Sequence, residues 1–473
     1  MDLKKGLDII KNNLLLAVLV LQPFLDIIAY AQRNSSISFA GYFRLALTVL
    51  LPVYVLFFGR DRKKFVISMS VICGFCALHI LNCFRVGYIS IFTDVKYMLL
   101  VSHAVFLLYS FMYLYEKDEI LRQIKTAFKV IIITVTVTHY LSYFLKSGLP
   151  TYVDSGTGWT GWCNTQNAFS IILSVLLPFA VCFCISSNKK ISFLFLIPFG
   201  YIYIMNGTKA AYITLVGTLF AFLVFVMAEY FIRKKEKFPV FVSLALAALL
   251  SCSIAFYNYS PRLDIDKIND ENIKLSQEIL NNKNHENIND PDNNNENDKI
   301  SEFLDKYMIK RFGKERYVAA YKDNITAERL ADNRLKKVIF ASLIWEETDT
   351  LTKFVGFEET NMYIENGTYD LENDPQAIFF YYGYIGTALY AGMLLYFLLR
   401  CVKQVICRFK ESFNYFNFAI LLDFGLLMIS ALYTGHLLRR PNSAIYLTAI
   451  LLLIYCRTEP LFKKKSDNSL EKK

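Results

Sequence analysis

Two carboxylates stand directly before an apolar run of span length. The segment ENDP at residues 372–375 contributes Glu372 and Asp374, and the apolar run follows at residues 376–400. A carboxylate can take the proton of a hydroxyl group or bind hydroxyls through hydrogen bonds. Both residues are therefore candidate catalytic residues. A second explanation stays open for Asp374, because aspartate before proline is also a frequent helix start.

Cationic side chains within or beside apolar runs form a second group of candidates. An ionisable group in a membrane span is costly and by default marks a functional site. Arginine and lysine stabilise phosphate oxygens, and the planar arginine fork suits them in particular. We therefore expect a basic pocket for a polyanionic headgroup. The candidate diphosphate contacts are Arg44, Lys209, Arg334 and Arg439.

Several of these charges also have structural explanations. An ion pair between Asp26 and Arg44 that joins the first two spans is as acceptable as a substrate role, and the sequence leaves both open. A hydrogen bond between helices explains Asp423, near the middle of a span, equally well. The loop cations Lys336 and Lys337 fit the solvated face of a helix.

The composition shows which elements must position these residues. Of the 473 residues, 55% are hydrophobic and 16% aromatic, which is too apolar for an ordinary soluble enzyme. Apolar runs approaching the roughly 20 residues that cross a hydrocarbon core of about 30 Å recur along the chain. We therefore predict an all-α polytopic membrane protein with about twelve spans. They lie near residues 11–31, 38–58, 65–83, 95–115, 127–145, 167–187, 191–206, 209–232, 239–257, 376–400, 415–434 and 441–456.

The short connections predict the orientation, since lysine and arginine beside a span resist translocation. Cationic clusters such as those at residues 60–64, 117–125 and 233–237 alternate with cation-poor loops and so fall on one side of the membrane. This pattern places both termini in the cytoplasm. The one long loop, residues 258–375, is then outside.

The long loop divides into two parts. Residues 264–300 are almost all Asn, Asp, Glu, Lys and Ile, a composition too polar to bury a core, and are interpreted as a flexible insertion. Residues 301–357 place apolar residues at helical spacing and predict amphipathic helices. The predicted organisation is nine spans in residues 1–257, this loop, three spans in residues 376–456 and a basic cytoplasmic tail at 457–473.

Cysteines and charge argue against several classes of protein. Cys73 and Cys76 form a CxxC in an apolar run without a second pair, so neither metal nor redox chemistry is indicated. The sequence leaves open a disulfide between Cys83 and Cys163. The net charge of +10 is accounted for by the cytoplasmic clusters and indicates the lipid bilayer, and no nucleic acid, as a partner.

Six segments in order carry a resemblance to a known family. They are LQPFLDIIAY with the following FR, GWCNTQNAFSIILSVLLPF, NGTKAAYITL, ADNRLKKVIFASLIW followed by FVGFE, ENDPQAIFFYYGYIGTALY and YTGHLLRRPNSAIYL. With the long loop between the ninth and tenth spans, the chain resembles the O-antigen ligase and polysaccharide polymerase superfamily. It is most similar to Gram-positive-type members described as O-antigen ligase-like membrane proteins.

The resemblance implies a membrane glycosyltransferase with a fold like that of the type C glycosyltransferases. It implies a multi-pass protein of the bacterial cytoplasmic membrane with the long loop extracytoplasmic. The implied donor is a glycan carried by a polyprenyl diphosphate such as undecaprenyl diphosphate, with no cofactor and no metal. A flippase and a chain-length regulator are candidate protein partners.

The resemblance also assigns roles to single residues. Arg334 matches a loop arginine of the family, although the two preceding residues depart from the family's small-residue pair, and this match adds it to the catalytic candidates. His436 matches the histidine of a Gly-His segment, which adds it to the catalytic candidates beside a structural, hydrogen-bonded role. Glu372 and Asp374 match an acidic pair spaced by one residue.

Three further residues are candidates to bind sugar. Asn167 belongs to the Asn-x-x-Asn segment, and the aromatic rings of Trp162 and Tyr381 could stack on sugar faces. A position in the interfacial aromatic belt explains such rings equally well.

The preferred function is a polymerase that joins lipid-linked oligosaccharide repeats into a surface polysaccharide, such as a capsule or exopolysaccharide of the cell envelope. A ligase, which hands the glycan to a different acceptor, stays open. A transporter or flippase of lipid-linked sugars is the rival from another class. Against it, the chain shows no similar halves, and alternating access does not need a large loop.

Overall fold

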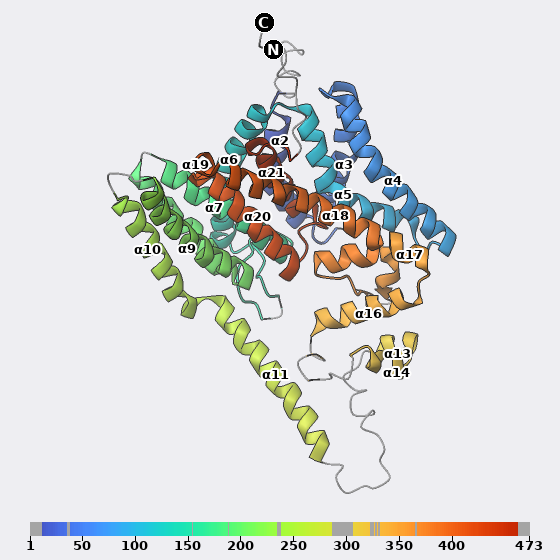
Figure 1. Ribbon diagram of the computed structural model, residues 1–473. Coiled ribbons are helices and arrows are strands. Elements are labelled where there is room, and N and C mark those ends of the chain that lie inside the picture. Colours follow the sequence, from blue (N-terminus) through green and yellow to red (C-terminus); the bar gives the residue numbers. More distant parts are fainter. Residues whose placement is uncertain are drawn as a thin grey trace. The chain divides into compact units, whose positions relative to one another are not determined.

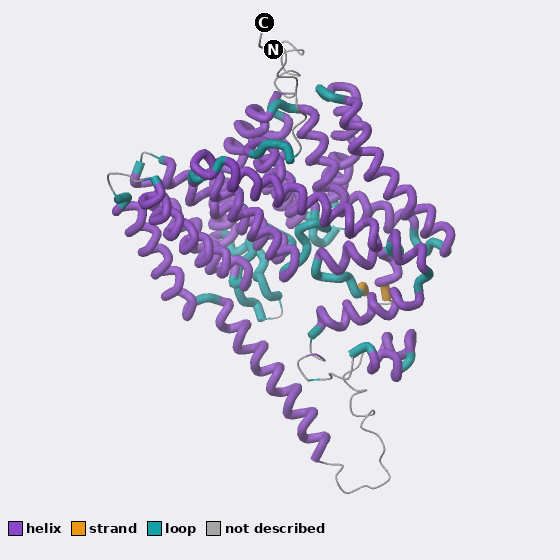
Figure 2. Tube along the Cα trace, viewed as in Figure 1, coloured by secondary structure: helices purple, strands orange, loops and turns teal. Residues whose placement is uncertain are grey.

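The computed structural model is almost entirely helical over the residues that it describes (Figure 2). Among those residues, the strands are the short antiparallel pair β1 (Tyr363–Ile364) and β2 (Gly367–Thr368). The all-α prediction is therefore confirmed. The described residues are 12–35, 38–153, 155–187, 189–233, 238–285, 306–321, 326, 329, 332–364 and 367–461.

Nine helices within the described ranges are long and apolar enough to cross a membrane. They are α2 (Leu14–Ala31), α3 (Phe39–Phe58), α4 (Arg62–Val86), α5 (Ile91–Leu114), α7 (Gln166–Ser186), α9 (Lys209–Ile232), α10 (Val240–Ala255) with η2 (Phe256–Tyr259), α18 (Asp374–Cys407) and α20 (Tyr415–Tyr433). The other three predicted spans coincide with α6 (Lys117–Phe144), with η1 (Lys190–Phe195) and α8 (Leu196–Asn206), and with α21 (Pro441–Arg457). These findings support a polytopic membrane protein.

The chain forms two compact units, and α4, α5, α11 (Pro261–His285) and α18 contribute residues to both. Unit 1 comprises residues 1–72, 99–262 and 390–473. Unit 2 comprises residues 73–98 and 263–389.

Two helices form the centre of unit 1. Almost every side chain of α7 is buried, and so are those of α21 from Pro441 to Ile454. A helix that is apolar on all sides belongs in a core, and α7 packs against α9, α20 and α21 (Figure 1). The polar residues Asn442 and Ser443, in the first turn of α21, are therefore placed inside unit 1.

Unit 2 contains the helices predicted for the long loop. They are α13 (Lys306–Phe312), α14 (Lys314–Ala319), α16 (Asn333–Glu347) and α17 (Thr350–Val355). The Trp345 ring of α16 packs against the rings of Phe357, Phe379 and Tyr384, which gives this unit an aromatic core. Asp332 caps α16 by accepting hydrogen bonds from the backbone of Arg334 and Leu335, so the departure from the family's small-residue pair still produces an ordered helix start.

A close backbone contact in unit 2 depends on two glycines. Gly356 ends α17 with φ +89°, and Gly383 interrupts the regular geometry of α18 with φ 63° and ψ −163°. A Cβ on Gly356 would lie 2.1 Å from the carbonyl oxygen of Tyr381, and one on Gly383 would lie 2.6 Å from the carbonyl oxygen of Lys353. Only glycine fits this approach of α17 to α18.

One prediction for the long loop is wrong in part. Residues 264–285 were expected to be flexible, but they belong to the helix α11 (Pro261–His285). Their polar composition hides a helical spacing that includes Ile265 and Ile268, and Ile265 is buried. Residues 286–300 lie outside the described residues, as does most of the basic tail at 457–473. Cys83, in unit 2, and Cys163, in unit 1, each carry a free thiol.

Candidate functional site

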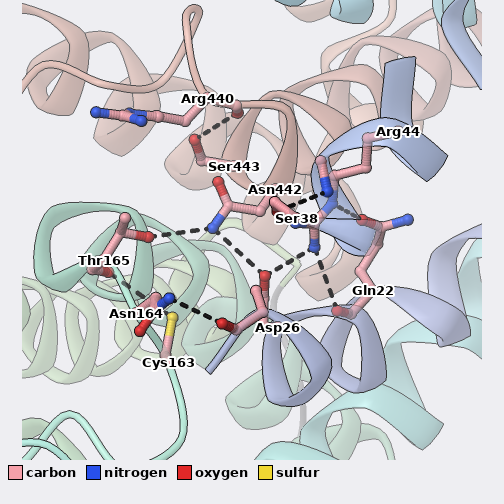
Figure 3. A network of polar contacts seen from close by, with 12 residues as sticks. Gln22, Asp26, Ser38, Arg44, Cys163, Asn164, Thr165, Arg440, Asn442 and Ser443 are labelled. Atoms are coloured by element: carbon pink, nitrogen blue, oxygen red, sulfur yellow. Dashed lines mark hydrogen bonds and ion pairs between the residues drawn. The ribbon is translucent and has the colours of Figure 1, made fainter. Parts of the chain in front are cut away.

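Asp26 on α2 and Arg44 on α3 form a buried ion pair in unit 1 (Figure 3). Arg44 Nη2 lies 2.7 Å from Asp26 Oδ1, and the two side chains are 7% and 11% exposed, respectively. Arg44 Nε also donates a hydrogen bond of 3.0 Å to Gln22 Oε1. Of the two explanations that the sequence left open, this geometry favours an intramembrane pair that joins two helices, because the guanidinium is buried and its charge is neutralised.

The same carboxylate is contacted from a distant part of the chain. Asn442 Nδ2, on α21, lies 3.5 Å from Asp26 Oδ1 and 3.3 Å from Thr165 Oγ1, before α7. The network thus joins α2, α3, α21 and the start of α7, as Figure 3 shows. Within unit 1, these contacts link the four segments to one another.

A small cavity of about 40 Å³ lies beside this network and is lined by Asp26, His139, Trp162 and Tyr446, among others. Within the described part of the chain, neither ring nitrogen of His139 nor the Tyr446 hydroxyl has a hydrogen-bond partner. The space accommodates water, which buried polar groups of this kind need, but it is too small for a sugar ring. Trp162, a candidate to bind sugar, contacts this cavity and donates from Nε1 to Ser147 Oγ at 3.0 Å.

His436 and Arg439 come together in unit 1. Arg439 Nη2 lies 3.4 Å from His436 Nδ1, and Arg439 is buried. The backbone of His436 has φ 62°, directly after Gly435 with φ 63°. A non-glycine residue in this region stores strain, and such strain is concentrated at functional sites. The hydroxyl of Ser443 donates to the carbonyl of His436 at 2.6 Å and holds the turn in place.

Two other candidates of unit 1 are placed apart from these contacts. Lys209 is exposed at the first position of α9, and within the described ranges it makes no ion pair. Asn167 is half-buried in the first turn of α7. Both keep their predicted binding roles as proposals.

Glu372 contacts two cations of α16 in unit 2. Its Oε2 lies 2.5 Å from Arg334 Nε, and its Oε1 lies 2.8 Å from Lys337 Nζ. We call Arg334, Lys337 and Glu372 the loop trio. Two of its members, Arg334 and Glu372, are among the four catalytic candidates that the sequence indicated. The third, Lys337, was interpreted as part of a solvated helix face, although its spacing of three residues from Arg334 places both on one side of the helix.

The surroundings of Glu372 change its pKa, and the pKa bears on its two predicted roles, which are to bind sugar hydroxyls and to accept a proton. Burial by itself would raise the pKa of this carboxyl group, but the hydrogen bond from Lys337 and the charges of Lys337 and Arg334 outweigh burial and lower the pKa. A carboxylate with a lowered pKa is a weak proton acceptor. The geometry therefore favours binding and positioning over acceptor activation by Glu372.

The remaining candidates of unit 2 are buried. Asp374 is fully buried in the first turn of α18, where Ala377 N bonds to the carbonyl of Asn373 and marks the helix start. The helix thus begins at Asp374 itself, and Asn373 rather than Asp374 accepts its first backbone hydrogen bond. Tyr381 is 1% exposed and packs edge-on against the rings of Tyr97 and Phe357, so no face of its ring is presented to solvent for a sugar.

The fold and these clusters define a helical membrane protein with positive charge held at the start of a loop helix. Residues 9–459 match the family described as O-antigen ligase like membrane protein, and the chain belongs to that family. Membership indicates a membrane enzyme that transfers glycans and acts on lipid-linked glycans. A comparison with curated proteins finds no match.

Proposed function

We propose that the protein polymerises polyprenyl-diphosphate-linked oligosaccharide repeats into a surface polysaccharide on the outer face of the cytoplasmic membrane. The observation that carries the proposal is the loop trio of unit 2. Family membership supplies the class of substrate, a lipid-linked glycan. The trio supplies groups suited to the diphosphate of that substrate.

The position of the trio on α16 favours an anionic ligand. Arg334, Lys336 and Lys337 lie among the first five residues of the helix, and its first turn contains no acidic residue after the capping Asp332. Cations are unfavourable there, because the helix dipole is positive at its N-terminus. Glu372 offsets one of the two cations that contact it, which leaves one net positive charge. A diphosphate beside this helix start would remove the unfavourable interaction.

The proposed reaction step needs the positive charge of the loop trio beside its leaving group, the polyprenyl diphosphate. The acceptor hydroxyl oxygen attacks the anomeric carbon of the donor's first sugar, and the C–O bond to the diphosphate breaks as the glycosidic bond forms. The electron pair of the broken bond departs with the polyprenyl diphosphate, and the hydroxyl proton passes to a base. Arg334 and Lys337 stabilise the departing anion as fixed cations, so that the step is metal-independent.

Within unit 1, we propose that His436 has a functional role beyond packing. Its strained backbone and its contact with Arg439 mark it as a side chain held for more than packing. His436→Asn is the appropriate variant, since asparagine tolerates positive φ and stays polar. Loss of transfer with a retained thermal transition would support the role. Unchanged transfer would assign His436 to structure.

The experiment that tests the function uses the full chain in nanodiscs. The protein receives a polyprenyl-diphosphate-linked repeat from the same cells, and lipid-linked products are followed by gel and mass spectrometry. A ladder of multiples that disappears in Arg334→Ala supports the polymerase. Transfer that appears only when a different acceptor is added would identify a ligase. Folded protein that binds the donor without any transfer would favour a flippase, which a lipid translocation assay then measures.

A further inference from the structure

Three side chains with metal-ligating atoms meet inside unit 2. His79 and Cys83 lie one turn apart on α4, Asp94 lies in the first turn of α5, and their donor atoms are all within 4.8 Å of one another. The residues are 0%, 5% and 2% exposed. Imidazole, thiolate and carboxylate are the ligand types of protein zinc sites. We propose that His79, Cys83 and Asp94 bind a zinc ion.

The distances agree with ligands of one ion. His79 Nε2 lies 3.2 Å from Asp94 Oδ2, 3.4 Å from Asp94 Oδ1 and 3.6 Å from Cys83 Sγ. A charge-assisted hydrogen bond between imidazolium and carboxylate would be shorter, about 2.7–2.9 Å. Zinc bonds of about 2.0–2.3 Å at tetrahedral angles separate donor atoms by roughly 3.3–3.7 Å. The separations of 3.4 Å and 3.6 Å lie within this range and that of 3.2 Å lies just below it, so all three are compatible with tetrahedral coordination.

The neighbours of the cluster orient its ligands. His79 Nδ1 lies 2.8 Å from the carbonyl oxygen of Val355, which can only accept, so Nδ1 carries the proton and Nε2 turns its lone pair to the cluster. This is the second-shell arrangement of zinc-binding histidines. The Tyr88 hydroxyl donates to Asp94 Oδ2 at 2.6 Å and fixes the carboxylate.

The charge of the three ligands and a neighbouring cavity also agree with a bound zinc ion. A divalent ion is balanced by the Cys83 thiolate and the Asp94 carboxylate, which makes the buried assembly neutral and avoids the cost of an unpaired charge. Binding releases the thiol proton to solvent. Cys83 also lines a cavity of about 450 Å³ in unit 2, together with polar residues such as Asn82 and Glu358, which offers an entry path for the ion.

The zinc site departs from the expectation of no metal, which rested on the single CxxC of Cys73 and Cys76 and on the family resemblance. The sequence did not indicate these ligands, because His79 and Cys83 both lie in the apolar run predicted as a span at residues 65–83. Their spacing of four residues nevertheless places both on one helix face.

The test measures metal in the full chain purified in nanodiscs without chelator. Mass spectrometry is expected to find about one zinc ion per chain, as a single site requires. His79→Ala, Cys83→Ser and Asp94→Asn are expected to lose the zinc. Cys252→Ser removes an exposed thiol of α10 and is expected to retain it.

A second readout keeps the proposal independent of variant folding. Co²⁺ added to the metal-depleted wild-type chain is expected to show tetrahedral d–d absorption and a thiolate charge-transfer band. Wild-type protein that melts cooperatively, holds no more zinc than Cys83→Ser and shows no thiolate band would overturn the proposal and leave a hydrogen-bonded His79–Asp94 pair. Neither readout depends on glycan transfer, so the outcome is separate from that of the proposed function.

Discussion

Arg334 Nε and Glu372 Oε2 lie 2.5 Å apart, which joins the start of α16 to the residue two positions before α18. Sequence reasoning placed the two residues in different roles, one on the diphosphate and one on the acceptor. Their contact places the two residues in one ion pair. The carboxylate is held ionised, and the guanidinium is oriented by it.

Arg334→Ala is expected to slow glycan transfer by roughly 10²-fold or more, the scale seen when one group that stabilises a developing anion is removed. Glu372→Gln is expected to have a smaller effect, because glutamine keeps the shape and removes only the orienting charge. Transfer rates at saturating donor measure both.

A matched control for these variants exists in the same unit. Arg316 pairs with Glu347, with Arg316 Nη1 2.6 Å from Glu347 Oε1, and the pair is also partly exposed. Arg316→Ala removes a similar ion pair outside the loop trio and is expected to leave transfer unchanged. Equal losses in Arg316→Ala and Arg334→Ala would show that the effect is one of unit stability.

Acid is expected to weaken the anchoring of α16. The folded-state pKa of Glu372 lies below its ordinary value of 4.5, so the contribution of the trio to stability is complete above that value and is lost as the pH falls through the lowered pKa. The fluorescence of Trp345, in a chain with Trp159 and Trp162 replaced by phenylalanine, reports the melting of α16 from neutral pH to pH values below 4.5. Glu372→Gln should flatten this dependence, and an equally steep profile in the variant would assign it to another group.

Replacement of only one member of the buried Asp26–Arg44 pair is expected to lower the stability of the protein strongly. Asp26→Ala leaves Arg44 buried without its carboxylate, which should destabilise the protein by about 3–5 kcal/mol. Replacement of both residues by leucine and methionine should cost much less, because no charge is left unpaired. Denaturant unfolding of the single and double variants in detergent measures the difference. A double variant as unstable as the single one would contradict this account.

Spans and loop helices were predictable because the pattern that indicates each one lies within its own segment of the sequence. The apolar run at residues 166–186 or the helical spacing in residues 333–347 needs no knowledge of the rest of the chain. The family segments added His436 to the candidates and gave Arg334 and Glu372, already candidates from the residues alone, positions in family motifs. For α11, composition was the wrong guide, since the helical spacing of its isoleucines was outweighed by the many polar residues between them.

Contacts between distant segments were not predictable in the same way. Asn442 meets Asp26 across 416 positions of sequence, and no pattern within either segment indicates the other. The pairing of Glu372 with Lys337 likewise required the fold, since a lysine on a loop helix is ordinarily a solvated one. The burial of Tyr381 also depends on partners from elsewhere in unit 2.

Any replacement of Gly383 is expected to destabilise the protein. Gly383→Ala places a Cβ 2.6 Å from the backbone of Gly356 and Lys353, in a conformation that is essentially restricted to glycine, so destabilisation of at least about 1–3 kcal/mol is expected. Gly392→Ala, in the same helix, meets nothing within 4 Å and should stabilise by roughly 0.5–1 kcal/mol. Thermal unfolding compares the two. Similar transitions for both variants would argue against the close contact.

The orientation of the chain is tested by cysteine labelling on whole cells. A cysteine at exposed Glu271 on α11 should react with an impermeant maleimide from outside, and one at exposed Lys63 should react only after permeabilisation. The wild-type chain, with its native thiols, supplies the baseline. The opposite pattern would invert the predicted topology.

The network around Asp26 has a consequence for biosynthesis. Asp26 and Arg44 leave the ribosome within one helical hairpin, so the two charges can enter the bilayer as a neutral couple. Asn442 follows only after the tenth and eleventh predicted spans have been made. The polar contacts of the first two helices are therefore completed only when the last helix has been made, and we expect a nascent chain that stops before α21 to expose Asp26 without its contact to Asn442.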